Sequence, residues 1–109
     1  MTLEGRVALI TGGGRGIGRA ISLALTLSKE ERRNGIHTNI VAPGVVDTEM
    51  GRRLVKGAAG VEDISTLDPV SPFGRVCQPE DVAAVVRWLV SDGAGYLNGE
   101  RIYVDGGAG

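Results

Sequence analysis

The 109-residue chain contains little cysteine, few aromatic residues and no long apolar run. Cys77 is its only cysteine, which excludes an internal disulfide framework and is typical of a reducing compartment. No apolar stretch reaches the roughly 20 residues of a membrane span, and the first residues lack the pattern of a signal peptide. We therefore expect a cytoplasmic protein with no membrane partner.

The chain also lacks an excess of charge of either sign, because its formal net charge is only −1. Neither nucleic acid nor an anionic membrane surface is therefore an expected partner. His37 is the only histidine, and no cluster of His, Cys, Asp and Glu predicts a metal site. We expect His37 to pack at the start of a strand and the Cys77 thiol to be inert. The length favours one domain over residues 1–109.

Glycine, by contrast, is abundant, with 18 residues gathered at four places that indicate turns. The first group separates an apolar run at 6–10 from a helical pattern that begins at residue 17. Basic residues close that helix before Gly35, and residues 36–41 form a second β-rich run. Strand, glycine turn, helix and strand make a βαβ unit with parallel strands.

The rest of the chain supplies further helices and one more strand. The pattern predicts short helices over 48–56 and 61–67, and a longer helix from Pro79 to the turn at Asp92 and Gly93. A last strand is expected over 101–104. The order predicts an α/β protein, a reduced Rossmann-like fold of about three parallel strands with flanking helices.

The glycine turn reads Thr-Gly-x-x-x-Gly-x-Gly from Thr11 to Gly18. Gly12 permits a tight turn, Gly16 lets backbone N–H groups approach a pyrophosphate, and Gly18 lets the helix pack closely. The following helix N-terminus favours an anion. The alternative is a glycine-rich turn that binds nothing.

These residues resemble the N-terminus of the short-chain dehydrogenase/reductase family, and 3-oxoacyl-acyl-carrier-protein reductases in particular. Later segments resemble the family's nicotinamide strand and loop, its last long helix and its closing strand. In this sequence they read RRNGIHTNIVAPGVVDTEM, PFGRVCQPEDVAAVVRWLVSD and YLNGERIYVDGG.

The resemblance implies a Rossmann-like domain that binds NAD or NADP. It places five residues on the pyrophosphate and adenosine side and three beside the nicotinamide. The first group is Gly12, Arg15, Gly16, Ile17 and Gly18, and the second is Gly44, Val46 and Thr48.

Two of these assignments have an equal alternative. Thr48 could instead cap a helix that begins at Glu49. Arg15 resembles members that prefer the phosphorylated cofactor, but a solvated arginine fits as well. The acidic residue that usually anchors the adenosine ribose is missing, so the choice of cofactor stays open.

The family's catalytic Tyr-x-x-x-Lys pair is also missing. Four residues after Tyr96 stands Glu100, and four after Tyr103 stands Gly107. We assign no catalytic residue and expect both tyrosines to pack. Lys29, beside Ser28, is expected to be solvated at a helix end.

The family's central strands are absent as well. The resemblance implies that the first helix joins two distant parts of the family between Leu25 and Ser28. We expect exposed sheet edges and a homo-oligomer formed through the last helix and the closing strand, with Trp88 and Ile102 as candidate contacts.

Three hypotheses remain open. The chain could be an oxidoreductase for a ketone, 3-oxoacyl group or alcohol, with its missing part supplied by further residues or by another chain. It could be a catalytically dead nucleotide-binding remnant. It could also be a structural or designed object that tests how small the fold can be.

Overall fold

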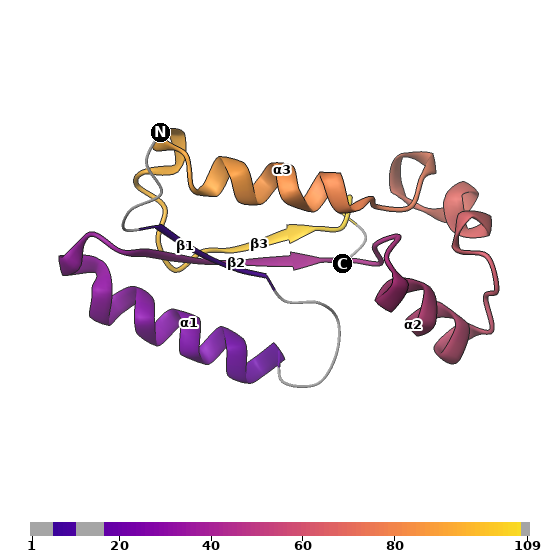
Figure 1. The fold of residues 1–109 in the computed structure, drawn as a ribbon, viewed down its shortest axis with the longest axis horizontal. Helices are drawn as coiled ribbons and strands as arrows, with labels where there is room; N and C mark the ends of the chain where they lie inside the picture. Colours follow the sequence, from indigo (N-terminus) through magenta and orange to yellow (C-terminus); the bar gives the residue numbers. More distant parts are fainter. Residues whose placement is uncertain (1–5, 11–16, 108–109) are drawn as a thin grey trace.

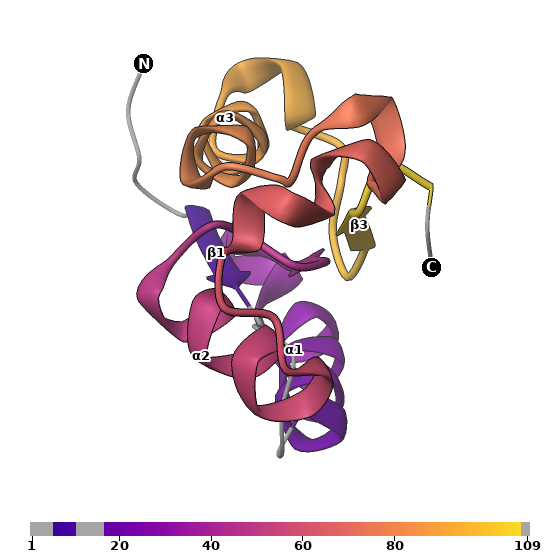
Figure 2. The ribbon, with the colours of Figure 1, turned by 90° about the vertical axis from the view of Figure 1, so that its right-hand side faces the viewer.

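The computed structural model describes residues 6–10 and 17–107, arranged as a parallel sheet between helices (Figure 1). The sheet has the order β1-β2-β3. Helix α1 lies on one face of the sheet and α3 on the other, and the end-on view in Figure 2 shows the three layers. The strands are β1 (Arg6–Ile10), β2 (His37–Pro43) and β3 (Arg101–Val104), and the helices are α1 (Ile17–Glu31), α2 (Glu49–Ala59) and α3 (Pro79–Leu89).

The strand pairing confirms the predicted α/β class with three parallel strands. β1 pairs with β2 from Arg6 opposite His37 to Ile10 opposite Val41. β2 pairs with β3 as far as Pro43 opposite Val104. The predicted last strand is confirmed at both ends, whereas β2 begins and ends later than the predicted 36–41. Because all pairs are parallel, the carboxyl ends of the strands meet at one edge of the sheet.

Helix α1 continues without a break across the junction that the sequence indicates between Leu25 and Ser28. Ala24 and Ser28 are buried, and the Ser28 hydroxyl donates to the Leu25 carbonyl oxygen at 2.7 Å. A short 3-10 helix (Arg32–Asn34) follows, and Gly35 ends it with φ 74°, as the basic run and the glycine predict.

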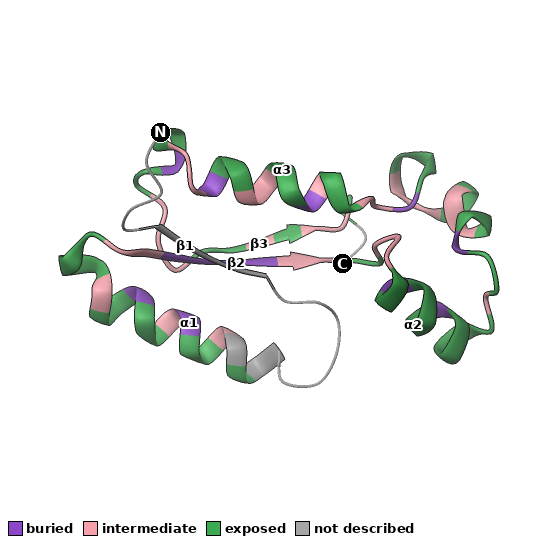
Figure 3. Ribbon diagram, in the orientation of Figure 1, coloured by how far each residue is buried: buried purple, intermediate pink, exposed green. Residues whose placement is uncertain are grey.

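Helix α3 covers the main core, whose buried residues are Val41, Val82, Leu89 and Ala94. A second, smaller cluster packs α2 against the segments that follow it and contains Val55, Ile64 and Val76. In Figure 3 the buried residues mark the inner faces of the helices and the middle of β2.

The helix predicted over 61–67 is wrong in position and in type. The segment is a 3-10 helix at Ile64–Val70. The Asp63 carboxylate accepts the Ser65 backbone N–H at 3.0 Å, so the first turn starts at Ile64. Pro69 removes an N–H donor from an α-helical ladder, which limits this segment to a short helix.

The aromatic side chains pack less than expected. Tyr96 is fully exposed and Tyr103 is 59% exposed, so the prediction that both pack within the chain is wrong. Alternation along β3 turns Ile102 toward the core under α3 and Tyr103 to the opposite face. Among residues 6–10 and 17–107, no helix is long and apolar enough to cross a membrane.

Candidate functional site

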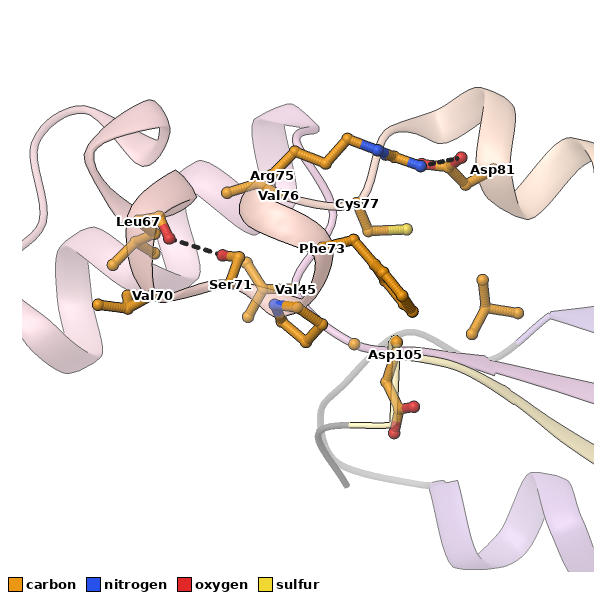
Figure 4. Close-up of a pocket in the computed structure, with 14 residues that line it drawn as sticks. Val45, Leu67, Val70, Ser71, Phe73, Arg75, Val76, Cys77, Asp81 and Asp105 are labelled. Atoms are coloured by element: carbon orange, nitrogen blue, oxygen red, sulfur yellow. Dashed lines mark hydrogen bonds and ion pairs between the residues drawn. The ribbon is translucent and has the colours of Figure 1, made fainter.

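The carboxyl ends of β2 and β3 open onto a cavity of about 460 Å³ (Figure 4). β2 runs into Gly44, whose N–H donates to the Val104 carbonyl oxygen at 3.1 Å. Most of the wall is apolar and comes from Val45, Leu67, Val70, Phe73, Val76 and Val104. The polar side chains at the wall are those of Ser71, Arg75, Cys77, Asp81 and Asp105. In open α/β sheets this edge is where ligands bind.

The loop after Gly44 is fixed to the segment that precedes α3. Val46 forms a parallel bridge with Cys77, and the Asp47 N–H donates to the Cys77 carbonyl oxygen at 2.8 Å. The Thr48 hydroxyl oxygen accepts the Gly51 N–H at 3.0 Å and so caps α2. The N-cap alternative for Thr48 is therefore observed. In this bond the Thr48 hydroxyl oxygen is the acceptor. The hydroxyl can therefore still donate its own proton to a ligand.

Gly51 brings α2 against the same loop. A Cβ at this position would lie 1.9 Å from the Val46 carbonyl oxygen, far inside any real contact. Only glycine lets the first turn of α2 approach the loop so closely.

A charged pair lies at the rim of the cavity, before α3. Arg75 donates two hydrogen bonds to Asp81, at 2.6 and 2.9 Å, and the Gln78 backbone N–H donates to the same carboxylate at 2.8 Å. These bonds, that from Arg75 foremost, lower the pKa of Asp81 to about 2. Hydrogen bonding to Asp81 in turn raises the pKa of Arg75. The pair is ionised at neutral pH.

The Cys77 thiol lines the cavity but is not activated. Burial, and next the charge of Asp81, raise its pKa above the ordinary value. Since the thiolate is the reactive form, this direction agrees with the prediction of an inert thiol.

Some of the predicted site residues lie after β2 or at the start of α1, and others lie outside the residues that the structure describes. Ile17 and Gly18 stand in the first turn of α1, and Gly44, Val46 and Thr48 follow β2. Because Ile10 pairs with Val41, the chain leaves β1 at the same edge as Gly44. Gly12, Arg15 and Gly16 lie outside the described residues.

The remaining candidate groups have structural roles. The His37 Nδ1 atom lies 3.0 Å from the Leu97 carbonyl oxygen, which confirms its packing role. Lys29 is exposed, while its neighbour Ser28 is buried and bonded within the helix. Within the described part of the chain, no three His, Cys, Asp or Glu side chains gather as a metal site requires.

Sequence reasoning missed two asparagines that hold the loop before β3. The Asn39 side-chain oxygen accepts the Glu100 N–H at 3.0 Å, and the side chain is buried. Asn98 accepts the Thr38 N–H at 3.0 Å and donates to the Ser28 carbonyl oxygen at 2.8 Å. In the sequence, Asn39 stands out as a polar residue inside an otherwise apolar strand. A buried amide needs hydrogen-bond partners, so this position could have been predicted to hold a neighbouring segment.

Known proteins resemble this chain in sequence. A family model described as enoyl-(acyl carrier protein) reductase matches residues 15–109. The 3beta-hydroxysteroid dehydrogenase 1 of Eggerthella lenta is 39% identical over 85 residues, which cover 78% of this chain and 31% of that protein. The NAD-dependent glycerol dehydrogenase of Listeria innocua is 38% identical over 87 residues, which cover 80% of this chain and 33% of that protein.

Among solved structures, the fold is similar to that of YwfH, an NADPH-dependent reductase involved in bacilysin biosynthesis. The TM-score is 0.78 at 23% identity, over 95% of this chain and 46% of YwfH. The chain thus spans 31–46% of the length of these three proteins. With the family model matching most of its residues, the chain belongs to the short-chain dehydrogenase/reductase family.

Proposed function

We propose that this chain is a nicotinamide-nucleotide-binding member of its family whose 109 residues do not perform hydride transfer by themselves. The observation that carries the proposal is the Gly44 loop, which leaves the carboxyl end of β2 and opens onto the cavity at the ends of β2 and β3. The names of two matched proteins point to NAD for one and NADPH for the other, so NAD or NADP is the ligand class.

At the phosphate end, the proposal uses the start of α1. Helix α1 begins at Ile17, after the chain has left the carboxyl end of β1, and the dipole at its N-terminus favours an anion. The motif assigns the phosphate contacts to Gly12, Arg15, Gly16, Ile17 and Gly18.

At the nicotinamide end, the proposal uses the loop that follows β2. An added Cβ on Gly44 would lie 3.2 Å from the Cβ of Asp105, so a glycine here lets the end of β2 pack closely against the residue that follows β3. Val46 and Thr48 follow in a loop that Cys77 holds in place. The Thr48 hydroxyl can donate its proton to a carboxamide oxygen while its oxygen keeps the cap.

When bound, a nicotinamide supplies hydride chemistry, but a substrate carbonyl also needs a proton donor. The sequence offers no Tyr-x-x-x-Lys for that task, and Tyr96 points into solvent. Binding without intrinsic catalysis therefore fits these residues best.

Titration with NADH, followed by the fluorescence of the reduced nicotinamide, tests the proposal. We expect saturable binding by the wild type. Thr48→Asn and Thr48→Asp both keep an N-cap acceptor, but only Asn keeps a donor. Loss of one hydrogen bond predicts about tenfold weaker binding for Thr48→Asp than for Thr48→Asn.

Unfolding curves of the two variants serve as the control, because both should remain as stable as the wild type. Equal affinity of Thr48→Asp and Thr48→Asn would overturn the role of Thr48. Absence of saturable binding by the wild type at millimolar NADH would overturn the function.

We also propose that the chain forms one Rossmann-like domain in the cytoplasm and assembles with copies of itself. The lone Cys77 supports a reducing compartment. The half-exposed Trp88 on α3 and the exposed Tyr103 on β3 support assembly through the last helix and closing strand. Ile102 does not, because it packs on the core.

A further inference from the structure

The chain contains two Asn-Gly pairs, Asn34-Gly35 and Asn98-Gly99. An asparagine before a glycine can lose its side-chain amide without an enzyme, because no side chain hinders the glycine nitrogen as it attacks the asparagine Cγ atom. The φ angles of Gly35 and Gly99 are nearly the same, 74° and 73°. The two glycines thus have a similar conformation, and the surroundings of the two pairs differ.

The Asn34-Gly35 pair is exposed, just after α1. A Cβ added to Gly35 would meet nothing within 4 Å, so the space around this glycine is open. The contacts of the pair are local. The Asn34 Nδ2 atom donates to a Glu31 carboxylate oxygen at 2.9 Å, and the Gly35 N–H donates to the Arg32 carbonyl oxygen at 3.1 Å. Bonds at an exposed helix end open at little cost, so the Gly35 nitrogen can reach the Asn34 side chain.

The Asn98-Gly99 pair is held by three hydrogen bonds to segments that are distant in sequence. The Asn98 side chain accepts the Thr38 N–H at 3.0 Å and donates to the Ser28 carbonyl oxygen at 2.8 Å. The Gly99 N–H, which would have to react, donates to the Thr38 carbonyl oxygen at 2.7 Å. A Cβ on Gly99 would lie 2.9 Å from the Ser28 Oγ atom, so α1 lies directly against the pair. Reaction here requires that the loop first separate from α1 and β2.

We propose that Asn34 is a site of spontaneous deamidation in the folded protein, and that the fold protects Asn98 from the same reaction. The Gly35 nitrogen gives its proton to solvent and forms a bond to the Asn34 Cγ atom, and the side-chain amide leaves as ammonia. Water then opens the cyclic imide at one of its two carbonyl groups, which leaves aspartate or isoaspartate. Water is consumed, ammonia is released, and nothing is oxidised or reduced.

The products differ in their effect on the fold. At residue 34 the new carboxylate stands beside that of Glu31, near the negative end of the α1 dipole, and therefore loosens this helix end. At Asn98 the change would remove the donor to the Ser28 carbonyl oxygen, because a carboxylate has no N–H. A loop that had opened and reacted could not reform this bond.

Mass spectrometry of the purified chain, incubated at mildly alkaline pH in heavy-oxygen water, tests the proposal. Cleavage after glutamate separates the two pairs into peptides 32–49 and 81–100, and fragmentation of the first distinguishes Asn34 from Asn39. We expect Asn34 to react about a hundredfold faster than Asn98, because opening the Asn98 pair breaks three bonds between separate segments. The products should carry oxygen from the water.

Denaturant provides the first control, because it removes the difference in surroundings, and the two pairs should then react at similar rates. Asn34→Gln provides the second. Glutamine keeps an amide that can donate to Glu31 but forms a cyclic imide far more slowly, so the more acidic form should no longer appear on ion-exchange chromatography.

Equal rates at Asn34 and Asn98 in the folded protein would overturn the protection by the fold. If Asn34 stays intact in the folded chain but reacts in denaturant, the assignment of a site at Asn34 is wrong. An acidic form that appears as fast in Asn34→Gln as in the wild type would also exclude that site.

Discussion

Gly51 is the position at which a single added carbon atom would force α2 away from the loop at Val46. Its missing Cβ lets the Val46 carbonyl oxygen occupy that space. We predict that Gly51→Ala lowers the free energy of unfolding by about 2 kcal/mol, because backbone on both sides must move. Denaturant unfolding followed by circular dichroism measures the change.

Gly57 provides the matched control in the same helix. It is exposed, and a Cβ there meets nothing within 4 Å. Gly57→Ala should therefore stabilise the protein by about 0.5–1 kcal/mol through helix propensity. Similar effects of the two substitutions would contradict the close approach at Gly51.

At the scale of elements, Asn98 joins three parts of the fold that are distant in sequence. From the loop before β3, its side chain bonds to Thr38 in β2 and to Ser28 in α1. We predict that Asn98→Ala costs about 2 kcal/mol, because a partly buried N–H and a carbonyl lose their partner. Chemical denaturation provides the measurement.

The matched control for Asn98 is Asn34, which has an exposed bond to Glu31. Asn34→Ala should change stability by less than about 0.5 kcal/mol. If the two alanine variants unfold at the same denaturant concentration, the bridge at Asn98 does not contribute as proposed.

The stability of the fold depends on pH through Asp81, in the first turn of α3. The pKa of Asp81 is about 2 in the folded state, lowered from its ordinary value of 3.8 foremost by the hydrogen bonds from Arg75. Its stabilising contribution is thus complete above about pH 4 and is lost as the pH falls toward 2. Unfolding midpoints at intervals between pH 5 and 2 should show this loss in the wild type.

Asp81→Asn removes the titrating group while keeping a side chain that can accept the Gln78 N–H. The difference in stability between wild type and this variant should shrink as the pH falls through that window. A difference that stays constant with pH would show that the bond from Arg75 adds nothing.

For the whole molecule, the sheet edges that no described strand covers and the exposed aromatic residues predict self-association. Trp88 is 47% exposed on α3, and Tyr103 faces away from α3. Size-exclusion chromatography with light scattering should show an oligomer. Trp88→Glu and Tyr103→Glu, tested separately, should shift it toward the monomer.

Tyr96→Glu is the control, because Tyr96 is equally aromatic but fully exposed outside α3 and β3. It should leave the oligomer unchanged. A wild-type protein that stays monomeric at high concentration would rule out assembly through either element.

Periodicity and turn chemistry made much of the fold predictable. The apolar run at 6–10, the helical pattern to Gly35 and the capped helix at Pro79 fix local conformation, so β1, α1 and α3 were predicted. The 3-10 segment at Ile64–Val70 was not, because the Asp63 turn and Pro69 outweigh a weak helical pattern.

The candidate site was predictable in part for the same reason. Thr48 and Gly44 lie in a local motif that carries its own spacing. Asn98 could not be found in this way, because its partners Thr38 and Ser28 are 60 and 70 residues away in the sequence and are brought near only by folding.

By itself, the sequence determined the class of the fold, the family and the absence of Tyr-x-x-x-Lys from these residues. Each of these depends on residue types at short spacing along the chain. Only the tertiary structure decided that β1 lies at the edge of the sheet, directly beside β2. Strand order is set by which apolar faces and backbone edges meet in space, and no local pattern records it.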